Sequence, residues 1–417
     1  MAARSARARM AWLAGWAGAS TRPPRTVAPP RRLAGPALAG GVLGAIFLLA
    51  TVAQGGFSAT WPFNVGERFG LASELAERGI HVTAQPGVGY DGQWYLALAT
   101  DPLLRGGIAD HFDNPRYRAG RPFQAWAGWL LAAGRPGLIP AALLVIGPLA
   151  AALGAAATAG VATAFGRSRW WGAGFVLVPG VAVGIAAVTS EPLALALAVL
   201  GVVLLLADRP VTAGLAFAGA ALTKESYLAF AVAAAIHLLL EPATDARRRG
   251  MGRLARAGMV LLPGLAGLAV WWVYLVGRLP SVPGQPDNAG SALGVPFSGW
   301  VGWLGKVVTG RYGPPDVPDS PGPVGGPFVV ISLALVAAGL LIGLSHRSLP
   351  ARVGLVLGGY ALVVGDALTW LFFSTMRALA PCVLAAMLAV LAEAPPRPRT
   401  APEPARAPPA TEDAPVT

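Results

Sequence analysis

One acidic side chain lies among three aromatic rings in the stretch GYDGQWY, residues 89–95. The carboxylate of Asp91 could act as a general base if a hydroxyl group lay within hydrogen-bond reach. Beside it, Tyr90, Trp94 and Tyr95 could bind an apolar or sugar-like group at the edge of a membrane. The alternative is a structural turn, because Asp-Gly is a common turn dipeptide.

Four further ionisable residues stand where apolar segments of the sequence begin or end. Glu191 precedes a proline at the start of one segment, and Lys224 and Glu225 follow a stretch of small residues. Arg377 stands at the start of the last apolar segment. Charged groups at a membrane edge tend to be functional or paired. The alternatives are a helix-capping role for Glu191, a local Lys224–Glu225 ion pair and an interfacial anchor for Arg377.

A second acidic patch, formed by Asp110, His111 and Asp113, lies farther along the same polar region. These side chains could bind a divalent metal, although such a site usually has more ligands. A solvated loop is the alternative. The sequence contains no Walker A loop, no dinucleotide-binding glycine fingerprint and no His-Glu-x-x-His zinc motif, which argues against a soluble type of nucleotide-sugar enzyme.

The composition is that of a membrane protein. Of the 417 residues, 55% are hydrophobic and 12% are charged, whereas a soluble domain carries about 25% charged residues. Apolar stretches of about twenty residues recur along the chain and indicate transmembrane helices. Membrane topology explains the net charge of +12, because the interleaved basic and aromatic residues of a nucleic-acid module are missing. The single cysteine, Cys382, excludes an intramolecular disulfide.

These patterns predict an all-α polytopic bundle of about ten transmembrane helices. We expect residues 1–35 to be a disordered basic cytoplasmic tail, 36–393 the transmembrane domain and 394–417 a disordered Pro/Ala-rich tail. Small residues four positions apart, such as Gly40 and Gly44, suit close helix packing. The spans are expected near 36–54, 138–165, 170–189, 191–207, 211–224, 226–240, 257–277, 327–345, 352–373 and 377–393.

Two Trp-rich segments suit the membrane surface better than its interior. Residues 123–133 are too short to span a bilayer, so we expect them to lie at the interface or to re-enter the membrane. In the Pro/Gly-rich region 278–326, Trp300, Trp303 and Lys306 have the spacing of an amphipathic helix. Such a helix could lie on the outer leaflet and guide a lipid. A membrane-anchored loop without a chemical role is the alternative.

The distribution of positive charge predicts the orientation. With the N-terminus inside, 20 of the 32 Lys and Arg residues fall on the cytoplasmic side, including the short basic loops. Both termini are then cytoplasmic, in the plasma membrane, and the first loop is long and extracytoplasmic. Asp91 and the four ionisable residues at segment ends all fall on the outer side, which predicts a single site there. Asp366 falls in the outer half of the ninth span, where it could face a cavity or pack within the bundle.

The first polar loop resembles that of the GT-C glycosyltransferases, and most closely that of the PIG-V-like mannosyltransferases. In that family an acidic residue precedes an aromatic stretch similar to the one from Asp91 to Ala99. Tyr90 stands where the family has Trp. The stretch 117–122 stands where the family has an aromatic and proline segment before the second span.

Two later motifs follow in the order that the family shows. Residues 189–193, TSEPL, resemble a Ser-Glu pair at the outer start of a helix. Residues 220–225, AALTKE, resemble a basic residue that closes a small-residue helix, with Lys224 where Arg is usual. The resemblance covers about residues 36–240, through three motifs that are short individually and ordered together.

The resemblance implies a GT-C-like membrane glycosyltransferase. It would move a sugar, such as mannose, from a polyprenyl-phosphate donor to the hydroxyl group of a lipid or glycan acceptor outside the cytoplasm, in contact with membrane lipid. Some GT-C enzymes use a divalent metal, which would make the acidic patch a candidate metal site. Asp91 would be the catalytic base. The substrate-binding residues would be Tyr90, Trp94, Tyr95, Glu191, Lys224, Glu225 and Arg377.

Two other classes of function stay open. A transporter or lipid flippase would place paired broken helices and charges near the middle of the bilayer, whereas most charges here fall at one predicted edge. A non-catalytic membrane scaffold would need none of these residues for chemistry. A nucleic-acid partner is not expected.

Overall fold

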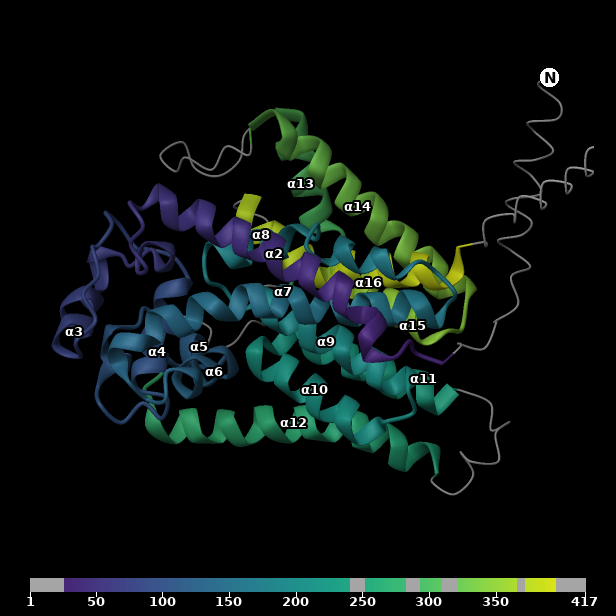
Figure 1. The fold of residues 1–417 in the computed structure, drawn as a ribbon, viewed down its shortest axis with the longest axis horizontal. Helices are drawn as coiled ribbons and strands as arrows, with labels where there is room; N and C mark the ends of the chain where they lie inside the picture. Colours follow the sequence, from purple (N-terminus) through teal and green to yellow (C-terminus); the bar gives the residue numbers. More distant parts are fainter. Residues whose placement is uncertain (1–25, 241–251, 283–292, 310–321, 366–371, 395–417) are drawn as a thin grey trace, which may run out of the picture. The chain divides into compact units, whose positions relative to one another are not determined.

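The part of the chain that the computed structural model describes is predominantly helical (Figure 1) and comprises residues 26–240, 252–282, 293–309, 322–365 and 372–394. Within these ranges there is no β-strand, and two isolated β-bridges join Gly66 to Gln85 and Leu293 to Val364. The predicted all-α class is therefore confirmed. Asp366, residues 1–25 and residues 395–417 lie outside the described residues.

Four of the described helices are long and apolar enough to cross a membrane. They are α2 (Pro30–Gln54), α7 (Ile139–Ala164), α12 (Arg253–Arg278) and α16 (Phe372–Glu393). A fifth crossing results if the 3₁₀ helix η5 (Arg169–Phe175) and α8 (Pro179–Ala186), which meet at 54°, form one bent span. Helix α2 starts six residues before the predicted span, inside the predicted tail.

Helices occupy all ten predicted spans, but several are shorter than the about twenty residues that a bilayer requires. Helices α9 (Glu191–Leu206), α10 (Pro210–Thr223) and α15 (Leu349–Val363) have 16, 14 and 15 residues. Pro210 at the start of α10 limits how far α9 can extend, because the residue before a proline disfavours helical geometry. The remaining apolar helices are α11 (Leu228–Leu240) and α14 (Gly322–Ser345). In the described part of the chain, the count of ten crossings is therefore not confirmed.

Helix α16 is central among these helices, whereas α2 and α12 are peripheral. The most apolar window of α16 is 83% buried, against 17% for α2 and 22% for α12. In Figure 1, α2 lies along α7 and α12 lies along α10. Large apolar side chains stay exposed on the outer helices, for example Leu38 on α2 and Val270 on α12. Such surfaces suit contact with lipid.

Glycines allow two of the closest helix contacts. A Cβ atom added to Gly40 of α2 would lie 2.6 Å from the carbonyl oxygen of Ala151 in α7. One added to Gly339 of α14 would lie 2.7 Å from the Cβ atom of Ala386 in α16. Neither position has room for a side chain, which agrees with the predicted packing role of small residues.

The polar region between α2 and α7 is folded around an apolar core that it shares with α7 and α12. It contains α3 (Leu71–Glu77), α4 (Gly92–Thr100), α5 (Pro115–Ala119) and α6 (Phe123–Leu131). The core includes fully buried side chains such as Phe63, Leu71, Leu96 and Ile108. The Trp-rich segment predicted as too short to span the membrane is helix α6. The second Trp-rich segment forms α13 (Ser298–Thr309), which packs on the end of α15 through a hydrogen bond from Trp300 to the carbonyl oxygen of Ala361.

Candidate functional site

Asp91 joins two arginines that come from distant parts of the chain. It is the residue before the first turn of α4, and its side chain makes no capping hydrogen bond to that helix. Its Oδ1 atom lies 2.8 Å from Nη1 of Arg118 in α5, and its Oδ2 atom lies 2.8 Å from Nη2 of Arg377 in α16. The Asp91 side chain is 23% exposed. The carboxylate therefore stays reachable from outside while it holds both cations.

Arg377 is the most highly connected residue of this region. Its guanidinium group donates through Nε to Oε1 of Glu191 at 2.9 Å and through Nη1 to the hydroxyl of Tyr90 at 3.0 Å. The group also lies 5.3 Å from the centroid of the Tyr90 ring. Because only 6% of the side chain is exposed, Arg377 is not a solvent-facing interfacial anchor.

Glu191 is fully buried at the start of α9 and holds two cations with one oxygen. Its Oε1 atom accepts hydrogen bonds from Nζ of Lys224 at 2.7 Å and from Arg377. The hydroxyl of Thr189 donates to Oε2. A carboxylate in the first turn also complements the helix dipole. The predicted capping position and the predicted contact with cations are therefore both present in the structure.

The residues Asp91, Arg118, Glu191, Lys224 and Arg377 form one continuous network of ion pairs, here called the charged cluster. Its members come from α4, α5, α9, the α10–α11 junction and α16. The structure thus brings together four of the five ionisable residues that the sequence placed at one site. Asp113 also pairs with Arg118, so three cations are balanced by three carboxylates in the connected network, and an anionic ligand would have to compete with a carboxylate for a guanidinium group.

Glu225, the fifth predicted residue, lies in a neighbouring pair. Its two carboxylate oxygens accept hydrogen bonds from Nε and Nη2 of Arg121, at 2.9 and 2.8 Å. The same Nη2 atom donates to the hydroxyl of Tyr117 at 3.0 Å. Lys224 and Glu225 therefore pair with different partners, although they are adjacent in sequence. This second pair fastens the first polar loop to the junction between α10 and α11.

Arg118 and Arg121 are the charged residues of this region that the sequence reasoning did not single out as site residues. Arg118 forks between two acids, because Nε and Nη2 also bind Asp113 at 2.7 Å each. Arg121 lies within the stretch 117–122, whose family resemblance was the one sequence feature that pointed to it. The spacing of Arg118 and Arg121 in the sequence does not by itself indicate which acidic residues they pair with.

The aromatic residues near Asp91 differ in their surroundings. Tyr90 contacts Arg377 directly, whereas Trp94 packs between Phe69 and Phe112 in the loop core, with ring centroids 5.5 and 5.3 Å apart. Trp94 is 4% exposed, and Tyr95 is equally buried. Burial raises the pKa of Tyr95 to about 12. Trp94 also contacts the charged cluster, because the guanidinium group of Arg118 lies 5.4 Å from the centroid of its ring.

The acidic patch Asp110, His111 and Asp113 is not assembled into a metal-ligand set. Asp113 pairs with Arg118, and Nδ1 of His111 lies 3.0 Å from the carbonyl oxygen of Phe69. No group of three or more His, Cys, Asp or Glu side chains is placed to hold a metal anywhere in the described ranges.

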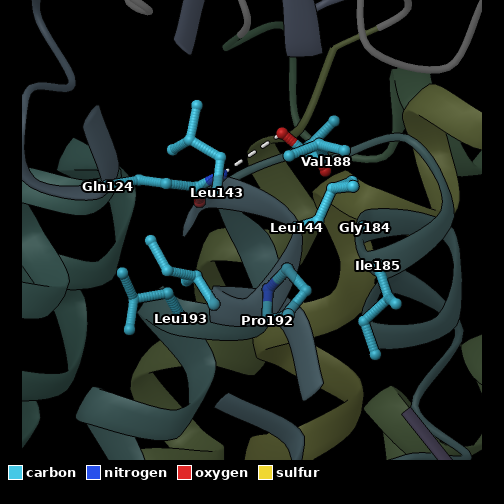
Figure 2. Close-up of a pocket in the computed structure, with 11 residues that line it drawn as sticks. Gln124, Leu143, Leu144, Gly184, Ile185, Val188, Pro192 and Leu193 are labelled. Atoms are coloured by element: carbon cyan, nitrogen blue, oxygen red, sulfur yellow. Dashed lines mark hydrogen bonds between the residues drawn. The ribbon is translucent and has the colours of Figure 1, made fainter. Parts of the chain in front are cut away.

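A strained turn positions the residues that contact Glu191. Val188 has φ of 49°, which is unfavourable for a β-branched residue. The turn is held by the amide of Gln124 in α6, whose Nε2 atom donates to the carbonyl oxygen of Val188 at 3.2 Å (Figure 2). It is also held by the hydrogen bond from Thr189 N to the carbonyl oxygen of Gly184 at 2.8 Å. These contacts place the Thr189 hydroxyl on Glu191.

The electrostatics of the cluster keep Asp91 ionised. Burial by itself would raise the pKa of Asp91, but the guanidinium groups of Arg377 and Arg118 outweigh it and hold this pKa well below its usual range. A carboxylate with such a low pKa is a weak base as long as both arginines remain paired with it. An anion that drew the arginines away would make Asp91 more basic.

Comparison with known proteins assigns no family. No family model matches the sequence, and no curated protein matches it. The geometry of the charged cluster is therefore the observation that bears on function.

Proposed function

We propose that the protein is an integral-membrane glycosyltransferase of the GT-C type. It transfers a sugar, such as mannose, from a polyprenyl-phosphate donor to the hydroxyl group of a lipid or glycan acceptor on the extracytoplasmic face of the plasma membrane, with both termini cytoplasmic. The observation that carries the proposal is the charged cluster, in which an ionised aspartate pairs with two arginines and a lysine joins the same network, next to apolar helices.

The cations of the cluster suit the departure of the donor phosphate, and its aspartate suits the activation of the acceptor. The bond between the anomeric carbon and the donor phosphate breaks, and the electron pair leaves with the phosphate. Arg377 and Lys224 are positioned to stabilise the charge that develops on it. The acceptor oxygen forms a new bond to the anomeric carbon, and its proton passes to Asp91.

The low pKa of Asp91 gives donor binding a role in activating the base. In the free protein Arg377 and Arg118 pair with Asp91. A donor phosphate competes for these guanidinium groups, because they bind phosphate in the same forked geometry as a carboxylate. Once they turn to the phosphate, the pKa of Asp91 rises toward its ordinary value. The base then forms only when a donor is present.

A lipid flippase that recognises the same phosphate is the second candidate function. It is favoured by the 54° break between η5 and α8, since discontinuous helices are typical of transport proteins. A non-catalytic scaffold is less favoured, because buried charges that do no chemistry are costly to keep in an apolar surrounding.

Radiolabelled polyprenyl-phosphate sugars separate these functions. Liposomes containing the full chain, a labelled donor and membrane lipid or glycan acceptors should yield label in an acceptor product if the protein is a transferase. Intact labelled donor that moves between leaflets without any product would support the flippase. An Asp110→Asn variant is the matched control, because that exposed acid lies outside the charged cluster. Absence of product with every donor sugar, from protein that remains folded, would contradict the transferase proposal.

A further inference from the structure

A patch of exposed arginine and tryptophan residues lies where the start of α2 meets η5. Arg31 and Arg32 belong to the first turn of α2, and Arg169, Trp170 and Trp171 begin η5. All five residues are exposed, and the two tryptophans are 53% exposed each. These five residues are here called the basic aromatic patch.

Contacts between the two segments hold the patch together. Nη1 of Arg169 donates a hydrogen bond to the carbonyl oxygen of Arg32 at 3.2 Å. The guanidinium group of Arg169 also lies 5.6 Å from the centroid of the Trp170 ring. A Cβ atom added to Gly35 would lie 3.3 Å from that ring, so Trp170 packs on the first turns of α2. The patch is therefore one assembled surface built from two distant parts of the sequence.

The patch lies at the end of the helices that is away from the charged cluster. Arg377 of that cluster is in the first two turns of α16, whereas Arg167, just before η5, donates to the carbonyl oxygen of Leu391 in its last turn. Helix α16 has 22 residues and is about 33 Å long, close to the about 30 Å of a bilayer's hydrocarbon core. In Figure 1, the start of α2 is likewise far from α3 and α4. Across a bilayer, the patch therefore faces the leaflet opposite to the charged cluster.

The positive charge of the patch is not neutralised by the described residues. In that part of the chain, none of the three arginines of the patch pairs with a carboxylate. Two carboxylates follow the ends of α9 and α16, but Asp208 pairs with Arg256, and Glu393 lies 3.8 Å from Nε2 of His346. Three cations close together without a carboxylate favour an anionic partner.

The phosphate of an anionic lipid has the chemistry that fits this patch. Guanidinium groups bind phosphate oxygens in a forked geometry, and tryptophan rings favour the headgroup level of a bilayer. Basic residues near an anionic leaflet attract its lipids additively. A zwitterionic lipid carries its own cation, and a soluble anion would leave the two exposed indoles without a partner. The combination of arginines and indoles thus favours an anionic lipid.

We propose that the basic aromatic patch binds the headgroup of an anionic phospholipid, such as phosphatidylglycerol, in the leaflet opposite to Asp91. The three arginines hold the phosphate, and Trp170 and Trp171 lie beside the glycerol and the first carbons of the acyl chains. A lipid bound in this way joins α2 to η5. The site uses no residue of the charged cluster, so it stands or falls separately from the proposed glycosyltransferase.

Lipid binding by the full chain tests the proposal. Protein purified in detergent without added lipid is titrated with phosphatidylglycerol or with phosphatidylcholine, and native mass spectrometry measures the affinity of the first lipid bound. Wild type should bind phosphatidylglycerol at least about tenfold more tightly, because three arginines contribute to its retention. Equal affinities for the two lipids would overturn the proposal, and this comparison needs no variant.

Two triple variants that lose the same charge locate the bound lipid. The first changes the three arginines of the patch to glutamine and should abolish the preference for phosphatidylglycerol. The control changes three exposed arginines outside the patch, through Arg209→Gln, Arg253→Gln and Arg347→Gln. It should keep the preference, because the patch is intact. An equal loss in both folded variants would assign the preference to net charge alone and contradict a defined site.

The tryptophans distinguish a lipid from a soluble anion. A double variant with Trp170→Leu and Trp171→Leu keeps every arginine and should bind phosphatidylglycerol several-fold more weakly, because leucine does not favour the headgroup level as tryptophan does. Inorganic phosphate in millimolar excess should not displace the lipid from wild type. Displacement by inorganic phosphate, or unchanged lipid binding by the folded double variant, would overturn the assignment to a lipid headgroup.

Discussion

Replacing Glu191 by glutamine should destabilise the folded protein by about 3 kcal/mol. The carboxylate is fully buried and neutralises two cations with a single oxygen, 2.7 Å from Lys224 and 2.9 Å from Arg377. Glutamine preserves the shape and one acceptor oxygen but removes the negative charge. Lys224, whose side chain is 16% exposed, then loses the one carboxylate to which the structure pairs it within the described residues.

The magnitude follows from what remains after the substitution. Removing one partner of a buried ion pair costs about 3–5 kcal/mol, because the other charge stays desolvated. Arg377 keeps Asp91 at 2.8 Å, and the glutamine oxygen still accepts a hydrogen bond, so the lower end of that range applies. A loss of this size changes the folding equilibrium by more than about a hundredfold, since 1.4 kcal/mol is tenfold.

Unfolding in mixed detergent micelles, followed by tryptophan fluorescence, measures this difference. Glu74→Gln is the matched control, because Glu74 and its partner Arg78 are about one-fifth exposed, four residues apart at the end of α3. That variant should lose less than about 1 kcal/mol. If both variants lost a similar small amount, the charged cluster would not be the desolvated network that the structure describes.

Three further outcomes follow from the structure. Because the pKa of Asp91 is held below its ordinary value, its ion pairs stabilise the protein at neutral pH, and this contribution is progressively lost as the pH falls below about 5. The unfolding temperature of wild type should therefore fall more steeply in this range than that of Asp91→Asn. Glu77→Cys in a Cys382→Ser background should react with a membrane-impermeant maleimide in intact cells, and reaction only after permeabilisation would place the first loop, and Asp91 with it, on the wrong side for the proposed donor. Gly339→Ala should lower the free energy of unfolding by about 1–3 kcal/mol because its new Cβ atom would press on α16; Gly359→Ala, which meets nothing within 4 Å, should not lower it.

The helical architecture could be predicted from the sequence because apolar runs and their breaks are local signals. The start of α10 at Pro210 and the end of α7 at Ala164 lie within a residue of the predicted limits. The number of membrane crossings could not be predicted, because α9 and α15 are apolar but too short, and burial against neighbours explains an apolar helix as well as lipid does. The 54° break between η5 and α8 was likewise hidden in a continuous apolar run.

The candidate site could be predicted where charge was rare and missed where charge was common. Glu191, Lys224 and Arg377 stood out because each interrupts apolar sequence, and the structure joins them. Arg118 did not stand out, since it lies in a polar loop with several other charged residues. Its pairing with Asp91 depends on the tertiary fold of the loop between α2 and α7.

The loop core also shows what the local pattern could not predict about individual contacts. Trp94 packs in the core between Phe69 and Phe112, with Arg118 over its ring. Whether an aromatic side chain next to a candidate base faces a ligand or a core depends on contacts with residues far away in sequence. Glu225 similarly pairs with Arg121, 104 positions earlier, rather than with its neighbour.

The central claim is that Asp91 takes the acceptor proton during sugar transfer from a lipid phosphate. Its most direct test is the single-turnover rate of transfer from a radiolabelled polyprenyl-phosphate sugar by purified protein in liposomes. Asp91→Asn should lower this rate by about 10²–10⁴-fold while donor binding persists. Asp113→Asn, which removes the other acidic partner of Arg118, should keep most of it. An undiminished rate with folded Asp91→Asn protein would contradict the account.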